Sequence, residues 1–274
     1  MRKSAVILPA GLACVAILLG WASQKRSSSP SGIRPFLYGQ ENVLRYLKKN
    51  GINLKVVDSV IRNASYDELF VSLFPSQSNQ FDVLRITTNG IKRISAPSRR
   101  VFAPAGEYFR AWLDPTGDAA VFHNGGNLQL PRFALFDCDP SGRYFVVGEK
   151  PSRTRIGRAD SLQDQQVLAQ DVLGSRIFAR DEHLFVCGNM PSGAAVCLEV
   201  VDKGGKFVVT ARHTLEWAAG IVDVDPEAGR LLLWNNSEFF TAAYIYDLST
   251  KRRSRVGRVQ GFELFLKHDL LAPE

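Results

Sequence analysis

The chain has few of the residue patterns that usually carry catalysis or bind metals. It contains four histidines and four cysteines, and neither a His-Glu-x-x-His nor a Cys-x-x-Cys spacing occurs. No Gly-x-Ser-x-Gly elbow is present to expose a serine nucleophile. Gly188 and Gly193 have the spacing of a phosphate loop, but Ala194 and Ala195 stand where Lys and Ser or Thr are required. The sequence therefore predicts no catalytic residues, no metal site and no cofactor.

The chain also has little excess charge beyond its first 26 residues. The net charge is +7, from 34 Lys and Arg against 27 Asp and Glu. Arg2, Lys3, Lys25 and Arg26 account for four of these cations, so 30 cations face 27 acids from Ser27 onward. This small excess does not predict nucleic-acid binding. With 45% hydrophobic and 22% charged residues, the composition is that of a folded protein rather than a disordered one.

The first 26 residues have the pattern of an export signal. Arg2 and Lys3 precede an almost unbroken apolar stretch, residues 4–22, which is just long enough to span a bilayer as a helix. We expect a signal anchor, with one span in the cytoplasmic (inner) membrane of a bacterium and the folded domain on the periplasmic side. The alternative is a signal peptide that is cleaved near Ala22, which releases a secreted protein.

A linker and one short helix are expected after the export segment. Residues 27–37 are rich in Ser and Pro, which is typical of a linker. The folded domain is then expected to cover residues 38–274. Its helix is predicted over residues 40–50, where Val43 and Leu47 share a helical face.

An apolar run, a turn with Asp and a second apolar run recur along the chain. Full copies surround Asp114, Asp139 and Asp225, each followed by Pro and then, two or three residues later, by Gly. Weaker copies surround Asp181 and Asp269. Asp-Pro-x-Gly forms a tight turn because Asp accepts backbone hydrogen bonds, Pro presets φ and Gly adopts a positive φ.

The spacing of these turns predicts a β-propeller. Asp139 and Asp181 are 42 residues apart, and the next two intervals, to Asp225 and to Asp269, are each 44 residues. A period of about 40–45 residues in a pattern of short strands is the size of one four-stranded blade. We expect an all-β propeller of five blades, with six as the alternative. The residues expected on equivalent strands are Trp112, Phe136, Phe178, Val222 and Phe265.

Two departures from the period affect this prediction. Asp114 precedes Asp139 by only 25 residues, so the second blade is expected to lack one or two strands. The chain also has one more first-strand pattern near its end, over residues 262–266. This strand is expected to complete the ring beside N-terminal strands.

The repeats resemble those of bacterial TolB-type and WD-like β-propellers. The resemblance is closest at residues 139–143, Asp-Pro-Ser-Gly-Arg, and at residues 244–250, Tyr-Ile-Tyr-Asp-Leu-Ser-Thr. It covers residues 54–269 and implies the propeller fold. It implies little about function, because such propellers serve as binding modules, scaffolds and enzymes alike.

Five basic residues form one candidate site. Lys92 and Arg93 are expected on the outer strand of the first blade, and Arg252, Arg253 and Arg255 on the outer strand of the last. A closed ring makes these blades neighbours, so the residues would form a basic rim near the tether that contacts an anionic membrane surface. The alternative is a solvated sheet edge whose charges prevent pairing with other sheets.

Cys187 and Cys197 flank one predicted hairpin and are a candidate disulfide. A five-residue loop, residues 190–194, places them directly opposite each other, where an oxidising compartment allows a cross-strand bridge. A four-residue loop turns the two sulfurs to opposite faces of the sheet. Free, buried thiols are the remaining alternative.

Two functions are consistent with this organisation. The inter-blade core, rather than a ligand site, is the expected place of Trp112, Trp217 and Trp234. Because the chain has an export segment and no catalytic motif, the leading hypothesis is a non-catalytic exported propeller. It would act as a scaffold at the membrane for an unknown protein or cell-envelope component. The alternative is an exported hydrolase or lyase whose acids converge at the propeller axis. The two are distinguished by whether carboxylates, or a His and Arg cluster, meet in one axial pocket.

Overall fold

A computed structural model describes residues 36–54, 58–73, 81–236, 241–258, 263–267 and 270–271. The predicted export segment, residues 4–22, and most of the predicted linker lie outside these residues. Within the described part of the chain, no helix is long and apolar enough to cross a membrane.

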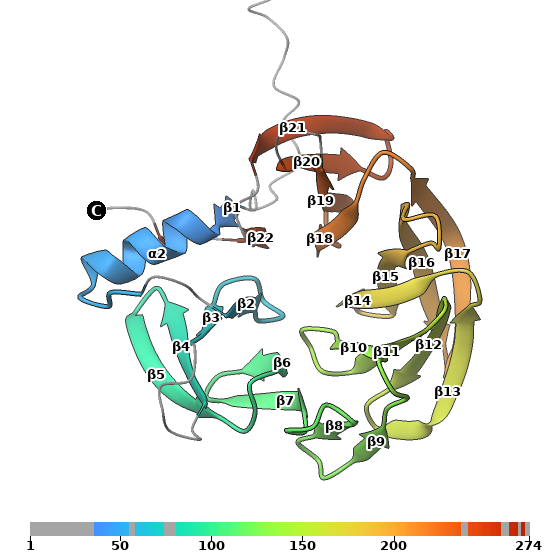
Figure 1. Cartoon of the computed structure of the whole chain (residues 1–274), viewed down its shortest axis with the longest axis horizontal. Coiled ribbons are helices and arrows are strands. Elements are labelled where there is room, and N and C mark those ends of the chain that lie inside the picture. The colour runs from blue at the N-terminus through green and yellow to red at the C-terminus, as the bar shows by residue number, and fades with distance from the viewer. Residues whose placement is uncertain are drawn as a thin grey trace, which may run out of the picture. The chain divides into compact units, whose positions relative to one another are not determined.

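The chain folds into five four-stranded antiparallel sheets that follow one another around a common centre (Figure 1). Blade 1 consists of β2 (Ser59–Arg62), β3 (Leu69–Ser72), β4 (Phe81–Thr87) and β5 (Gly90–Ala96). Blade 2 consists of β6 (Val101–Ala105), β7 (Tyr108–Leu113), β8 (Ala119–Phe122) and β9 (Asn127–Gln129). Blade 3 consists of β10 (Leu135–Cys138), β11 (Tyr144–Glu149), β12 (Arg153–Arg158) and β13 (Ser161–Ala169).

Blades 4 and 5 complete the ring. Blade 4 consists of β14 (Leu173–Arg180), β15 (His183–Asn189), β16 (Ala195–Lys203) and β17 (Lys206–Leu215). Blade 5 consists of β18 (Gly220–Asp225), β19 (Arg230–Asn236), β20 (Thr241–Asp247) and β21 (Arg252–Arg258). The prediction of a five-bladed all-β propeller is therefore confirmed.

A two-stranded sheet joins the two ends of the propeller. β1 (Phe36–Gly39) pairs antiparallel with β22 (Glu263–Leu266), and Phe36 lies opposite Leu266. The last strand pattern thus completes the ring beside an N-terminal strand, as predicted. β1 begins two residues before the expected start of the domain at residue 38, so the end of the predicted linker is a strand.

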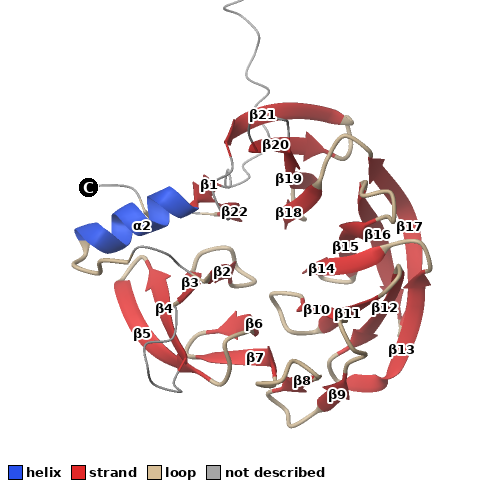
Figure 2. Ribbon diagram, in the orientation of Figure 1, coloured by secondary structure: helices blue, strands red, loops and turns tan. Residues whose placement is uncertain are grey.

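The predicted helix is also confirmed. It is α2 (Gln40–Lys49), the one helix among the described residues (Figure 2). Its buried side chains Val43 and Leu47 pack with residues of blade 1 and β22 in one apolar cluster. An amphipathic helix of this length is stabilised mainly by such packing.

Blade 2 corrects one prediction. It is complete, and Trp112 lies on its second strand, β7, whereas Phe136, Phe178 and Val222 lie on first strands. The Asp114 turn joins the second and third strands of its blade. The Asp139 turn joins the first and second, so the interval of 25 residues is only part of a period. The error has a physical reason, because Asp-Pro-x-Gly stabilises a tight turn between any two antiparallel strands.

The order of the strands gives the propeller two unlike faces. Because the strands are antiparallel, connections between strands 1 and 2 and between strands 3 and 4 lie at the same end. We call this end the turn face; it includes the turns after Asp139, Asp202 and Asp225. The crossover face carries the connections between strands 2 and 3 and the passages from blade to blade, such as residues 190–194 and 216–219.

The turn motif has the geometry that its sequence predicts. The buried Asp139 carboxylate accepts hydrogen bonds from the backbone N–H groups of Ser141, Arg143 and Tyr144, at 2.9, 2.9 and 2.7 Å. Gly142 follows with a φ of 72°. Several donors for one buried carboxylate explain why this turn is so well defined.

A buried ion pair links the first blade to the last. Arg62 of β2 donates from Nε and Nη2 to the carboxylate of Asp223 in β18, at 3.2 and 2.9 Å. The same carboxylate accepts from the backbone N–H of Phe265 in β22, at 2.7 Å. The Arg62 guanidinium also lies 3.4 Å from the centre of the Tyr66 ring. Blade 1, blade 5 and the closing sheet therefore meet at one charged pair.

Candidate functional site

Acidic and basic side chains converge at a cavity of about 40 Å³ that is lined by residues of β2, β6, β10, β14, β18 and β22. These strands lie nearest the centre of the ring in Figure 1. The charged residues that line the cavity are Arg62, Asp137, Arg176 and Asp223. They come from blades 1, 3, 4 and 5, so the convergence that the alternative function requires is present. A catalytic role would require a cavity large enough for a substrate and carboxylates that are not already held by other protein groups.

The axial acids are engaged in bonds within the protein. Asp223 is paired with Arg62 and accepts from Phe265, and Asp137 accepts from the backbone N–H of Ile177 at 2.8 Å. Burial raises the pKa of Asp137 to about 6, although the charge of Arg176 acts in the opposite direction. A cavity of about 40 Å³ holds a few water molecules, whereas sites for organic ligands occupy roughly 300–1,000 Å³. The geometry therefore does not favour a substrate site for a hydrolase or lyase at the axis.

Two larger concavities lie away from the axis. One is a groove of about 460 Å³ between blades 4 and 5 on the crossover face. We call it the Trp217 groove, and it is lined by Met190, Ser192, Gly193, Ala194, Thr214, Glu216, Trp217, Ala218, Ala219 and Asn235. The loop over residues 190–194 forms one wall, where Met190 donates its backbone N–H to Ala194 at 2.9 Å.

Trp217 is held by aromatic and cationic neighbours. The Tyr244 ring meets it edge-on, with centroids 5.4 Å apart, and the Arg253 guanidinium lies 4.5 Å from the centre of a Trp217 ring. Trp217 is partly buried and packs against the apolar cluster shared by blades 4 and 5, and it also lines the groove, so the expectation that it belongs to the core rather than to a ligand site stays a prediction. Its place at the edge of a groove was missed, since a sequence does not show which core residues border open space.

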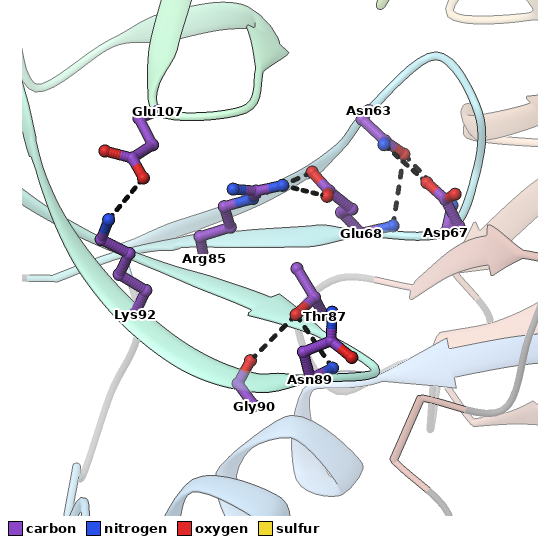
Figure 3. A network of polar contacts seen from close by, with 9 residues as sticks. All are labelled: Asn63, Asp67, Glu68, Arg85, Thr87, Asn89, Gly90, Lys92 and Glu107. Carbon is purple, nitrogen blue, oxygen red and sulfur yellow. Dashed lines mark hydrogen bonds and ion pairs between the residues drawn. The ribbon is translucent and has the colours of Figure 1, made fainter.

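A second groove, of about 450 Å³, lies on the turn face of blade 1. Figure 3 shows its polar network, in which Arg85 pairs with Glu68 and Lys92 with Glu107. The Asn63 side chain organises the adjoining loop by accepting from the backbone N–H groups of Asp67 and Glu68. Because its charged groups already pair with each other, this groove offers a weaker binding surface than the Trp217 groove.

The five basic residues of the candidate rim lie on the predicted outer strands of blades 1 and 5. Arg252, Arg253 and Arg255 are in β21, and Lys92 and Arg93 are in β5. The β1–β22 sheet and α2 lie between these two outer strands (Figure 1). Lys92 pairs with Glu107, Arg93 lies 3.4 Å from Asp82, and Arg253 stacks on Trp217. The closing sheet therefore lies between the two groups of basic residues, and their contact with an anionic membrane surface stays a prediction.

Cys187 and Cys197 lie directly opposite each other on β15 and β16. Both are buried, both thiols are free, and the two Sγ atoms are 3.6 Å apart. Burial raises the pKa of the Cys187 thiol well above its ordinary value. The five-residue loop is thus the one that forms, and the disulfide remains a prediction.

We predict that mild oxidation of the native protein joins Cys187 to Cys197. A disulfide needs an S–S distance of about 2.05 Å, so the two Sγ atoms, now 3.6 Å apart, have to move only a short way toward each other. The reaction should be slow, because a buried thiol with a raised pKa supplies little thiolate. The measurement is a mass loss of about 2 Da, with peptide mapping after unfolding and alkylation, and Cys138 serves as the internal control. Recovery of both thiols unmodified after prolonged oxidation contradicts this prediction.

Glu263 is an acid in an unfavourable position at the start of β22. Burial raises the pKa of its carboxyl to about 7, and within the described part of the chain its Oε2 is buried without a hydrogen-bond partner. The native carboxyl therefore holds its proton at a pH where the unfolded one has lost it. The contribution of Glu263 to stability is fully present below about pH 4.5 and is lost as the pH rises through about 7.

We predict that Glu263→Gln removes this loss. The variant should exceed the wild type in free energy of unfolding at pH 8 by about 2 kcal/mol, and the difference should disappear near pH 4.5. Urea unfolding at the two pH values measures it. The exposed Glu216→Gln is the control and should leave the pH dependence unchanged. An equal pH slope for wild type and Glu263→Gln contradicts the assignment.

Three or more His, Cys, Asp or Glu side chains do not gather closely enough to hold a metal ion anywhere in the described ranges. Asp139 and Asp225 bond to turn residues next to them in sequence. Asp137 and Asp223 face the axial cavity instead.

Comparisons with known proteins agree with the fold. No family model matches the chain, and no curated protein matches it in sequence. Similar solved structures include TolB from Acinetobacter baumannii, with a TM-score of 0.49 and 10% identity over 77% of this chain and 57% of that chain. Another is a nidogen/laminin complex, with a TM-score of 0.49 and 13% identity over 78% of this chain and 86% of that chain.

A WD40 domain is also among the similar structures. The Neurospora crassa Pan2 WD40 domain has a TM-score of 0.42 and 9% identity over 74% of this chain and 66% of that chain. The chain spans 57% of the TolB chain and 65% of a similar hydrazine synthase chain from Kuenenia stuttgartiensis. The resemblance to TolB-type and WD-like propellers is thus one of fold, and the functional argument rests on the residues of this chain.

Proposed function

We propose that this chain is a non-catalytic binding module that presents the crossover face of its propeller to a protein or cell-envelope partner. The observation that carries the proposal is the Trp217 groove, whose volume of about 460 Å³ far exceeds the 40 Å³ of the axial cavity. Trp, Tyr and Arg are the residue types that contribute most to protein interfaces. Trp217 lines the groove, and its ring packs against Tyr244 and Arg253.

The proposal includes export and anchoring. Residues 4–22 would span the inner membrane once, and residues 27–35 would tether the propeller on the periplasmic side. The chain enters the propeller at Phe36, opposite Leu266, which is the turn-face end of β22. The Trp217 groove is on the other face, so it is accessible to a partner that approaches from the side opposite the tether attachment.

Site-specific photo-crosslinking of the full-length chain in its native membrane tests the binding role. We expect a probe at the exposed Ser192, in the groove wall, to give one discrete adduct. A matched probe at the exposed Tyr108 on the turn face should give none. Glu216→Lys, which reverses an exposed charge in the groove, should reduce the Ser192 adduct at least tenfold without lowering the melting temperature. Equal labelling from both positions, or an adduct insensitive to Glu216→Lys, would argue against the Trp217 groove.

Cell fractionation tests the membrane anchor and the periplasmic location separately. Alkaline extraction should leave the full-length chain in the membrane, and protease added to spheroplasts should digest the propeller. A cleaved, secreted form or a protected propeller contradicts the anchor while leaving the groove assignment open to its own test.

A further inference from the structure

The side chain of Phe133 stands in solvent on the crossover face, in the passage from blade 2 to blade 3. The residue is 67% exposed, more than any other large apolar residue in the described part of the chain. Its backbone has a φ of 62°, which a bulky residue rarely adopts. Leu135, at the start of β10, is exposed as well. A large apolar side chain that is held outside the core by an unfavourable backbone conformation indicates a contact with another molecule.

Two cations without acidic partners flank the Phe133 ring. The Arg132 guanidinium lies 4.8 Å and the Lys150 Nζ 5.8 Å from the centre of the ring. Both residues are exposed, and neither forms an ion pair with a described residue. The neighbouring acid, Glu149, is already engaged by two arginines of β12. We call Arg132, Phe133, Leu135 and Lys150 the Phe133 patch, and its complement is a surface that is hollow, apolar and acidic at its edge.

The Trp217 groove has these complementary properties. Its volume of about 460 Å³ is in the range of sites that enclose a drug-sized ligand, so an aromatic side chain fits. Glu216 is the one charged residue in the described lining; it is exposed and forms no ion pair with a described residue. A Phe ring that enters the groove meets Trp217, and aromatic pairs of this kind are favourable edge-to-face. The cations beside Phe133 would then face the carboxylate of Glu216.

The two surfaces occupy equivalent places on one face of the ring. Residues 130–134 lead from β9, the outermost strand of blade 2, to β10, the innermost strand of blade 3, and residues 216–219 lead in the same way from β17 to β18 (Figure 1). Both passages therefore lie at a similar distance from the axis. A two-fold axis that is parallel to the face and midway between them exchanges their places. Residues 170–172 lie midway, where Asp171 pairs with Arg212 at 2.8 Å and so brings no unpaired charge.

We propose that the protein partner of the Trp217 groove is a second copy of this chain. The two copies bind with their crossover faces together, and each inserts its Phe133 patch into the Trp217 groove of the other. This inference rests on the proposed function and names the partner. The two-fold symmetry closes the assembly, so it is a dimer rather than a fibre. Because the same contact occurs twice, one substitution weakens the dimer at two places.

Sedimentation equilibrium of the full-length chain in detergent tests the proposal. We expect a dimer, and Phe133→Ser should raise its dissociation constant at least about tenfold, as for other aromatic residues at the centre of an interface. Tyr108→Ser removes another exposed aromatic ring, on the turn face, and should leave the dissociation constant unchanged. A monomeric wild type overturns the proposal. A dimer that survives Phe133→Ser overturns it too, because association then comes from residues 4–22 or from another surface.

Charge reversal tests the pairing across the interface. Glu216→Lys should weaken the dimer at least about tenfold, and so should Arg132→Glu combined with Lys150→Glu, because each change brings like charges together. The variant with all three substitutions has opposite charges facing each other again and should recover most of the affinity. A triple variant that dimerises no better than the others overturns the proposed pairing.

The photo-probe at Ser192 separates this inference from the proposed function. We expect its adduct in the native membrane to have the mass of two chains, and peptide mapping should place the second end of the crosslink within residues 130–135. An adduct with a different protein overturns the second copy as the partner but supports the groove as a binding site. The absence of any adduct from Ser192 overturns both.

Discussion

Replacing Arg62 with Met is expected to lower the free energy of unfolding by about 3–5 kcal/mol, the usual cost of removing one partner of a buried ion pair. The Asp223 carboxylate would remain buried without its counter-ion, since none of its surface is exposed. Burial disfavours the charge of Arg62, but Asp223 and Tyr66 together more than offset this and raise the pKa of the guanidinium. Urea unfolding of the full-length chain measures the loss.

Two further variants separate the charge from the geometry. Arg62→Lys keeps the charge but not the two-pronged contact with Asp223, so it should lose less than Arg62→Met but remain clearly destabilised. Arg180→Met removes an exposed arginine on β14 and should change stability by less than about 0.5 kcal/mol. If Arg62→Met is no more harmful than Arg180→Met, the ion pair does not hold blades 1 and 5 together.

The second large effect is expected at Gly148. This buried residue of β11 packs against the backbone of the next blade, and a Cβ there would lie 2.1 Å from the carbonyl oxygen of Gly174. A backbone atom cannot rotate away as a side chain can, so Gly148→Ala must push blades 3 and 4 apart. Overpacking of this kind costs about 1–3 kcal/mol, and we expect a value near 3 in urea unfolding.

Gly257 provides the matched control for this substitution. It lies in β21, and a Cβ there would meet no atom within 4 Å. Gly257→Ala should therefore be neutral or slightly stabilising, because alanine reduces the freedom of the unfolded chain. Similar losses for the two variants would mean that blade spacing is not set at Gly148.

The turns that mark the repeat were predictable because their signals are local. The turns at Asp139, Asp181 and Asp225 are encoded by adjacent residues. The Asp139 carboxylate, for example, accepts hydrogen bonds from Ser141, Arg143 and Tyr144, all within five positions. The turn residues do not show which two strands of a blade the turn joins. For that reason Trp112 was expected on a first strand, while the structure places it on the second strand of a complete blade.

The length of the loop between Cys187 and Cys197 could not be predicted from local signals. The sequence allowed a four-residue or a five-residue loop, and a shift of one residue in register turns every side chain to the other face of a sheet. Packing decided between them, because Cys187 and Cys197 both enter the apolar cluster that blades 4 and 5 share.

The sequence by itself determined the repeat, the class of fold, the single short helix and the strand that closes the ring, since each depends on periodicity and on neighbouring residues. Only the tertiary structure decided which residues meet across the ring. Arg62 and Asp223 are 161 positions apart, and neither carries a local signal of the other. The separation of the two basic strands and the opening beside Trp217 were decided in the same way, because they depend on how complete blades pack around the closing sheet.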